Sequence, residues 1–232
     1  MGIEITGWGK CTPPSILTNK DLETILDTDD EWIVSRTGVK ERRIAHTSLS
    51  DMGTVAAQHA LAAADKDPQD IDAVIMATCT PQYIIPTTAS RIQENIGNKH
   101  AAAFELNSAC TGFVYGLTTA YSLISSGVMK NILLVGGEKV SFFLDWGARD
   151  TAVLFGDGAG AVVLEESDEP GILSVCLGAS GKEAELLYTP GGGSKDPNGY
   201  RFLKMEGKEV FKEAVKVIQS NSLEAIESAN LN

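Results

Sequence analysis

The sequence predicts an α/β layered fold, and three observations support this prediction. Short apolar runs alternate with segments of helical periodicity along most of the 232 residues. Two of the runs, 73–79 and 132–136, are almost wholly apolar, as expected of strands in a sheet that is covered on both faces. The composition, 43% hydrophobic and 22% charged, is typical of a globular chain that buries one large core or two smaller ones.

The first part of the chain supplies most of the predicted elements. Glycines at 97 and 127 follow helical patterns and mark helix ends, while Pro86 marks a helix start. In order, we expect a strand at 3–8, short helices at 19–26 and 30–36, a helix capped by Ser50 and continuing through Ala63, a strand at 73–79, a helix from Pro86-Thr87 to Gly97, a strand at 101–106 buried on both faces, a helix at 113–124 and a strand at 132–136.

The later part of the chain begins with a glycine-rich run at 156–160. Apolar runs at 151–155 and 161–164 flank Gly156-Asp157-Gly158, which indicates a hairpin. A dinucleotide loop is not expected, because a strand pattern follows the glycines where a phosphate-binding helix would be needed. The acidic stretch 165–171 marks a boundary between parts 1–169 and 170–232. Beyond it we expect a strand at 172–177, a loop at 191–193 and a long helix from 206 to about 228.

Cys110 is the most informative residue. It stands in the run 107–113 (Asn-Ser-Ala-Cys-Thr-Gly-Phe), between a predicted strand and a predicted helix. Unpaired backbone N–H groups and the helix dipole favour thiolate over thiol at a helix N-terminus, so this position suits a nucleophile. From position alone, a small residue buried at a tight turn is the favoured interpretation, because free cysteine is among the most buried residue types.

Charge and cysteine usage exclude several classes of function. The net charge of −12 argues against nucleic acid as a partner. No apolar stretch approaches eighteen residues and the start is acidic, so we expect neither a membrane span nor a secretory signal, and we place the protein in the cytoplasm. The four cysteines and three histidines lack ligand spacing, so we expect no metal site and no disulfide framework.

Two surface patterns each allow two interpretations. Trp32 and Arg36 are one helical turn apart and can form a platform for an adenine and its phosphates, or can be ordinary surface packing. Lys208, Lys212 and Lys216 form one basic stripe, which is either a solvated face or a docking edge for an acidic partner.

Three segments together resemble one enzyme family. The run 27–39 (Asp-Thr-Asp-Asp-Glu-Trp-Ile-Val-Ser-Arg-Thr-Gly-Val), the Cys110 run and the run 155–161 (Phe-Gly-Asp-Gly-Ala-Gly-Ala) resemble β-ketoacyl-acyl-carrier-protein synthase III, the thiolase-fold condensing enzyme that initiates fatty-acid synthesis. The resemblance implies a pseudo-duplicated α-β-α-β-α fold. In that fold, 1–169 is the N-terminal half with the nucleophile, and 170–232 is the opening part of a C-terminal half that this chain holds in truncated form.

The resemblance also assigns roles to individual residues. Cys110 becomes the catalytic nucleophile, Ile85 takes the place of a phenylalanine that closes the acyl pocket across a dimer, and Lys212 matches a lysine of the carrier-protein docking edge. The remaining matches bind coenzyme A, the first four at its nucleotide end and the last three along the pantetheine tunnel: Thr28, Trp32, Arg36, Arg149, Met205, Gly207 and Phe211.

The implied activity is a Claisen condensation of a short acyl-coenzyme A with malonyl-acyl carrier protein through acyl-Cys110, in a homodimer and with no cofactor besides the coenzyme A thioester substrate. Family members use a histidine in a Pro-His-Gln-Ala-Asn stretch and an asparagine, both beyond Asn232. We therefore expect a truncated form with an unpaired sheet edge and an exposed apolar helix face, in which His46, His59 and His100 are ordinary surface or edge residues. Two alternatives stay open: acyl transfer alone in a secondary-metabolite pathway, and a non-catalytic acyl- or coenzyme-A-binding module completed by a second chain.

Overall fold

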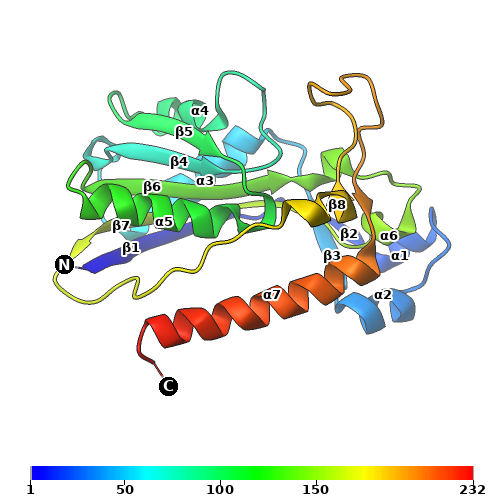
Figure 1. Cartoon of the computed structure of the whole chain (residues 1–232). Helices are drawn as coiled ribbons and strands as arrows, with labels where there is room; N and C mark the ends of the chain where they lie inside the picture. The colour runs from blue at the N-terminus through cyan, green and yellow to red at the C-terminus, as the bar shows by residue number, and fades with distance from the viewer. Residues whose placement is uncertain (1, 232) are drawn as a thin grey trace. The chain divides into compact units, whose positions relative to one another are not determined.

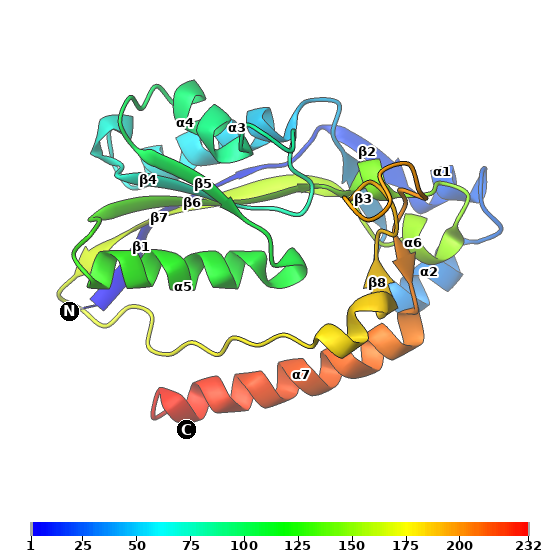
Figure 2. The ribbon, with the colours of Figure 1, turned by 45° about the horizontal axis from the view of Figure 1, so that its top comes forward.

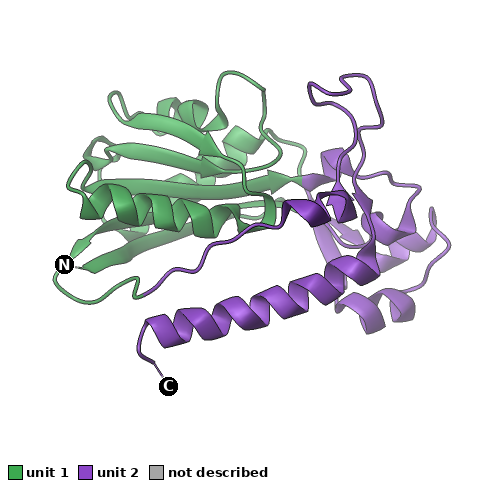
Figure 3. Cartoon of the chain, in the orientation of Figure 1, with its two compact units in different colours: residues 1–14, 45–139, 157–173 green, residues 15–44, 140–156, 174–232 purple. Residues whose placement is uncertain are grey.

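The structure, a computed structural model, describes residues 2–231 and divides into two compact units (Figure 3). Unit 1 comprises residues 1–14, 45–139 and 157–173, and unit 2 comprises residues 15–44, 140–156 and 174–232. The units reflect where contacts concentrate. They do not test the division into duplicated halves, 1–169 and 170–232, which stays a prediction.

Unit 1 is built on a five-stranded sheet with the order β1-β7-β6-β4-β5 (Figure 1). Strand β4 is parallel to both of its neighbours, β6 and β5, whereas β7 is antiparallel to β6 and to β1. The strands are β1 (Gly2–Cys11), β4 (Ala73–Ala77), β5 (Ala102–Leu106), β6 (Asn131–Lys139) and β7 (Asp157–Ser167).

Helices cover both faces of this sheet, as the all-apolar strands predicted. Helices α3 (Leu49–Ala63) and α4 (Thr88–Asn95) lie on one face and α5 (Gly112–Ser125) on the other (Figure 2). Side chains of a strand alternate between faces. Met76 accordingly belongs to the core on the α3 and α4 side, while Ile75 belongs to the core on the α5 side. Short 3₁₀ turns at Pro68–Asp70 and Ala109–Thr111 complete the unit.

The helix ends follow the expected capping chemistry, with one correction. Ser48, not Ser50, caps α3: its hydroxyl accepts the N–H of Asp51 at 3.1 Å, and the Asp51 carboxylate accepts the N–H of Ser48 at 3.2 Å. Ser50 lies inside the helix, and its hydroxyl donates to the side chain of Gln82 at 2.6 Å. Gly97 follows α4 with a φ of +81°, as a helix-ending glycine does.

Two strand expectations near the sheet are wrong. Strand β5 is not buried on both faces, because it is the edge strand and only half covered. The run 156–158 is not a hairpin turn. Asp157 and Gly158 already belong to β7, whose register places Asp157 opposite Lys139, and residues 151–155 form no strand. Long partner strands on both sides, β6 and β1, extend β7 through the glycines and override the local turn signal.

Unit 2 has a smaller core in which Leu22, Ile33 and Val153 are buried. The predicted strand at 172–177 does not form. Its first residue, Ile172, donates its N–H to the carbonyl of Ile3 in β1 at 3.1 Å, but no strand ladder continues from there among the described residues. The elements of the unit are β2 (Ser15–Thr18), α1 (Asn19–Glu23), α2 (Asp30–Thr37), β3 (Glu41–Ile44), a 3₁₀ turn at Val140–Phe143, α6 (Arg149–Ala152), a 3₁₀ turn at Gly181–Leu186, β8 (Leu187–Tyr188), β9 (Lys204–Met205) and α7 (Gly207–Ser228).

Helix α7 confirms the expected exposed apolar helix face. It has 22 residues, none of them buried, and its apolar side chains Phe211, Val215 and Ile218 are all exposed. These three residues are spaced at i, i+4 and i+7, so they form one apolar stripe along the helix. No helix in residues 2–231 combines the length and the apolar character that crossing a bilayer requires.

The packing of α3 on β1 gives a test of the fold. A Cβ atom at Gly9 would meet the backbone oxygen of Ala56 and lie 2.5 Å from the backbone nitrogen of Ala60, so Gly9→Ala must push α3 away. We expect the variant to lose about 1–3 kcal/mol of unfolding free energy in urea titrations. Gly193→Ala, whose Cβ has open space around it, is the control and should change stability by less than about 0.5 kcal/mol. Equal stability of the two variants would contradict the packing.

Candidate active site

Cys110 lies in unit 1, in the turn Ala109–Thr111 between β5 and α5, and its side chain is exposed. Ala109 before it has a φ of +45°, a left-handed conformation that few non-glycine residues adopt. Local hydrogen bonds hold the turn: the Ala109 N–H donates to Asn107 Oδ1 at 3.2 Å, and the Thr111 hydroxyl donates to the Ser108 carbonyl at 2.9 Å. Backbone conformations of this kind concentrate at functional sites.

Small residues bring the start of α5 close to the sheet. A Cβ at Gly112 would lie 3.5 Å from Ala77 Cβ, and a Cβ at Gly136 would lie 2.8 Å from the ring of Phe113. Ala77 and Gly136 are register partners in β4 and β6, at the edge where these parallel strands end. Cys110 therefore stands at the carboxyl edge of the parallel strands, the usual position of functional residues in such sheets.

The other three cysteines are less suited to react. Burial raises the pKa of the Cys11 thiol. Burial, reinforced by the charge of Glu138, raises the pKa of Cys79 to about 12. Desolvation, followed by a hydrogen bond to Glu224, raises the pKa of Cys176. Because the thiolate is the nucleophile, each of these shifts lowers reactivity at neutral pH. The structure therefore favours the nucleophile interpretation of Cys110 over a buried structural one.

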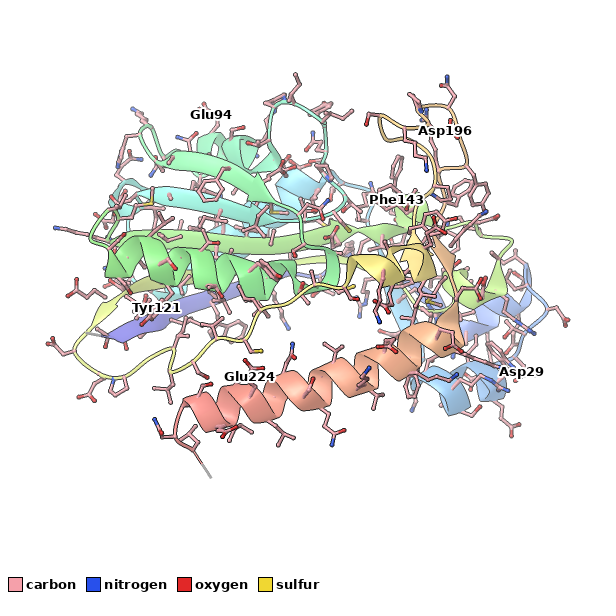
Figure 4. All side chains as sticks on the ribbon, in the orientation of Figure 1. Asp29, Glu94, Tyr121, Phe143, Asp196 and Glu224 are labelled. Atoms are coloured by element: carbon pink, nitrogen blue, oxygen red, sulfur yellow. The ribbon has the colours of Figure 1, made fainter. Side chains whose placement is uncertain are left out.

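Trp32, Arg36 and Arg149 come together in unit 2. Arg36 is on the same helix as Trp32, and its guanidinium carbon lies 4.5 Å from the centroid of the indole ring. Arg149 comes from α6, and its guanidinium carbon also lies 4.5 Å from that centroid. Asp29 precedes α2 (Figure 4), and its side chain caps the helix by accepting the N–H of Trp32 at 2.7 Å. This cap fixes Trp32 in the first turn of α2. The arrangement offers an aromatic plane and two cations to a nucleotide.

Thr28 lies just before α2, and its hydroxyl is enclosed without a hydrogen-bond partner among the described residues. A buried hydroxyl without a partner is uncommon in a folded protein. The Arg149 guanidinium donates to the carbonyl of Asp27, the neighbouring residue, at 2.8 Å. Thr28 and Arg149 thus belong to one region of unit 2, as predicted for a shared ligand.

The three predicted tunnel residues also belong to unit 2. Met205 is half-buried in β9, where it pairs with Leu187 of β8. The Met205 methyl carbon would lie 3.5 Å from a Cβ at Gly207, the first residue of α7. Phe211 is 70% exposed and so belongs to no hydrophobic core in this structure.

Ile85 and Lys212 occupy exposed positions. Ile85 is 83% exposed, in the loop between β4 and α4. Lys212 is ion-paired with Glu209 at 2.7 Å, and Lys216 approaches Glu213 at 3.8 Å, so α7 itself neutralises part of the basic stripe. His46, His59 and His100 are exposed, as expected, and the His59 ring contacts the carbonyl of Lys10 at 3.1 Å. Within residues 2–231, no group of three metal-ligating side chains forms a candidate metal site.

Sequence reasoning missed Glu138. It lies near the end of β6, and its carboxylate accepts hydrogen bonds from the backbone N–H of Cys79 at 2.7 Å and from the Thr80 hydroxyl at 2.5 Å. The available signal was a carboxylate two residues after the end of the predicted apolar strand 132–136. The identity of its partners depends on which strands are neighbours, and the sequence pattern does not contain that information.

Comparison with known proteins gives a consistent result. Residues 104–181 match the family model described as 3-oxoacyl-[acyl-carrier-protein (ACP)] synthase III. A β-ketoacyl-[acyl-carrier-protein] synthase III 2 of Vibrio vulnificus is 50% identical over 235 residues, which cover 99% of this chain and 65% of the relative. The β-ketoacyl-[acyl-carrier-protein] synthase III of a Roseiflexus species is 47% identical over 238 residues, covering 98% of this chain and 72% of the relative. The chain thus spans less than two thirds of the length of the Vibrio relative.

Solved structures support the same relationship and confirm the thiolase-like α/β fold. The 3-oxoacyl-[acyl-carrier-protein] synthase III of Aquifex aeolicus superposes with a TM-score of 0.94 at 43% identity, over 100% of this chain and 73% of that one. The priming β-ketosynthase of the R1128 polyketide pathway superposes with a TM-score of 0.93 at 34% identity, over 100% of this chain and 71% of that one. From these identities and this coverage, the chain belongs to the β-ketoacyl-[acyl-carrier-protein] synthase III family.

Proposed function

We propose that this chain takes part in the condensation that initiates fatty-acid synthesis, with Cys110 as the residue that accepts a short acyl group from acyl-coenzyme A. The observation that carries the proposal is the position of Cys110: it is exposed, on a strained turn, directly before α5. The Vibrio relative of 50% identity supports fatty-acid initiation over a polyketide pathway, whose priming enzyme is 34% identical.

The chemistry at Cys110 is thioester exchange. The Cys110 sulfur attacks the thioester carbonyl carbon, a new C–S bond forms, and the coenzyme A thiolate leaves with the electron pair of the broken C–S bond. In the second half of the family's reaction, malonyl-acyl carrier protein loses carbon dioxide, and the resulting carbanion attacks the acyl carbon and releases Cys110. The thioester is itself the substrate, so the proposal involves no further cofactor.

For coenzyme A, we propose that Thr28, Trp32, Arg36 and Arg149 bind the nucleotide end. An indole plane suits an adenine and guanidinium groups suit phosphates, and the hydroxyl of Thr28 has no hydrogen-bond partner within residues 2–231. Met205, Gly207 and Phe211 are proposed to contact the pantetheine arm, whose apolar and amide groups fit a half-buried methionine and an exposed phenylalanine.

The proposed protein partners are an acyl carrier protein and a second copy of the chain. Lys212 is the candidate contact to the acidic carrier, although Glu209 competes for its charge.

A homodimer is supported by β5, an edge strand that is half-exposed, and by the apolar residues Ile84 and Ile85 in the loop before α4. The N–H of Thr88 at the start of α4 donates to Glu105 of β5 at 2.7 Å, so this loop enters next to the strand. We also propose a cytoplasmic location, because the four cysteines are free and thiols stay reduced in the cytosol.

The first test concerns the nucleophile. After brief treatment with iodoacetamide or acetyl-coenzyme A at pH 7.5, peptide mapping should find the label on Cys110 far ahead of the other cysteines. Because the pKa of Cys79 is raised to about 12, its thiolate stays scarce until strongly alkaline pH and its labelling should rise only there. Cys110→Ser is the control and should remove the fast phase. Fast labelling of Cys79 or Cys176 in folded protein would contradict the assignment.

The second test concerns coenzyme A binding. Trp32→Ala, Arg36→Ala and Arg149→Ala should each weaken coenzyme A binding by about 1–2 kcal/mol, roughly 5- to 30-fold in Kd by calorimetry, because each removes part of the stacked platform. Arg91→Ala is the matched control, since Arg91 also lies over an aromatic ring, that of Tyr83 at 5.9 Å, but in unit 1. Unchanged affinity for coenzyme A in all three variants would show that Trp32, Arg36 and Arg149 only pack against one another on the surface.

The third test concerns the dimer. Ile85→Asp places a charge in an apolar contact between copies, so sedimentation should show a shift from dimer toward monomer, with a dimer Kd raised at least tenfold. Val128→Asp, at a residue 68% exposed elsewhere in unit 1, is the control and should leave the dimer intact. A chain that is monomeric before substitution would refute the dimer proposal directly.

A further inference from the structure

Glu138 binds the segment 78–80 that follows β4 and has no role in the proposed function. Ala77 and Gly136, register partners in β4 and β6, both face α5, since Gly112 packs on Ala77 and Phe113 packs on Gly136. Side chains two residues apart share a face. Glu138 therefore faces the α5 side, and Cys79 follows two residues after Ala77, at the end of β4 against which α5 begins.

The Glu138 carboxylate gathers donors from one short segment after β4. Its Oε1 accepts the N–H of Cys79 at 2.7 Å, and its Oε2 accepts the hydroxyls of Thr78 at 3.1 Å and Thr80 at 2.5 Å. The Cys79 thiol is a further donor to this carboxylate. One side chain thus holds three consecutive residues that belong to no strand or helix.

The two hydroxyls are committed to this arrangement. The Thr78 hydroxyl already accepts the N–H of Thr80 at 3.0 Å, and the Thr80 hydroxyl accepts the N–H of Lys139 at 2.8 Å. Both threonines are buried. Their hydroxyl protons therefore point to Glu138, which as a carboxylate only accepts. Removing the carboxylate leaves buried donors without partners, which destabilises the segment.

The segment also shares an electrostatic environment with the nucleophile. The pKa of Cys79 is raised first by burial, next by the charge of Glu138 and its hydrogen bond, and further by the nearby Cys110 thiol. Cys79 thus lies in the electrostatic field of Cys110, and the carboxylate beside Cys79 opposes the ionisation of its thiol.

We propose that Glu138 is a positioning residue of the Cys110 site: it fixes Thr78–Thr80 as a wall beside the nucleophile and prevents Cys79 from competing with Cys110 for the acyl group. The inference rests on the proposed function, because it assumes that Cys110 is the sulfur that takes the acyl group. The wall presents a small, neutral thiol toward the reacting carbon, so acylation is confined to one sulfur.

The experiment compares Glu138→Gln, which removes the charge and keeps the shape, with Glu138→Ala, which removes all the hydrogen bonds from this side chain to residues 78–80. These hydrogen bonds are called the clamp below. Glu94→Gln is the control, because Glu94 is an exposed carboxylate on α4 of the same unit (Figure 4). In each full-length variant, peptide mapping measures iodoacetamide labelling of Cys79 and Cys110 between pH 7 and pH 10, and intact-protein mass measures acylation by acetyl-coenzyme A.

Glu138→Gln should increase the labelling rate of Cys79 at pH 9 about tenfold, since one pKa unit changes the thiolate fraction tenfold. Glu138→Ala should in addition slow acylation of Cys110 about tenfold and spread acyl label onto Cys79. A purely structural carboxylate would not move the pH profile of Cys79. Thr80→Val, which removes one donor to the clamp, should slow acylation with little change in that profile, and it replaces Glu138→Ala if that variant does not fold.

Cys79 labelling that is the same in Glu138→Gln and wild type would overturn the role of the charge, and wild-type acylation in both Glu138→Ala and Thr80→Val would overturn the role of the clamp. A wild-type chain that takes no acyl group from acetyl-coenzyme A contradicts the proposed function instead. The labelling profile of Cys79 still decides the role of Glu138 in that case.

Discussion

The close approach of α5 to the sheet is the constraint that determines where the candidate nucleophile lies. Gly112 packs on Ala77, Gly136 on the ring of Phe113, and Gly116 on Leu134, where an added Cβ would lie 2.5 Å from a methyl carbon. An added Cβ at Gly116 or Gly136 would have to displace the side chain of Leu134 or Phe113 or shift α5, whereas one at Gly112 would lie at ordinary contact distance from Ala77. Because Cys110 directly precedes α5, it would move with the helix, so glycines that contact no substrate still control the geometry of the site.

Burial and nearby carboxylates rank the four cysteines by reactivity. Glu138 and Glu224 each accept from a thiol and oppose its ionisation, at Cys79 and Cys176 respectively, while Cys11 is held neutral by burial alone. Cys110 is the exposed one. Selectivity for one sulfur therefore depends as much on suppressing the other thiols as on activating the nucleophile.

The sequence was informative where periodicity and local chemistry act alone. Helix α7, the apolar strands β4 and β6, and the pairing of Trp32 with Arg36 follow from spacing within one element. The hairpin expected at 156–158 failed because β1 and β6, distant in sequence, extend β7 through its glycines. The sequence links Arg149 to Trp32 only through the family resemblance, because the two residues lie far apart along the chain. Glu138 was missed for a related reason, since its partners at 78–80 are neighbours only across the sheet.

The platform around Trp32 explains why modest effects are expected from its substitution. Both guanidinium carbons already lie 4.5 Å from the ring centroid, and an adenine sandwiched between an indole and a guanidinium needs about 7 Å between them. One arginine must therefore move to admit a base. Arg149 has a second anchor outside the ring contact, because its guanidinium donates to the Asp27 carbonyl at 2.8 Å. Binding thus exchanges a cation–π contact for stacking on the base, and the net gain is the difference between two interactions of similar size.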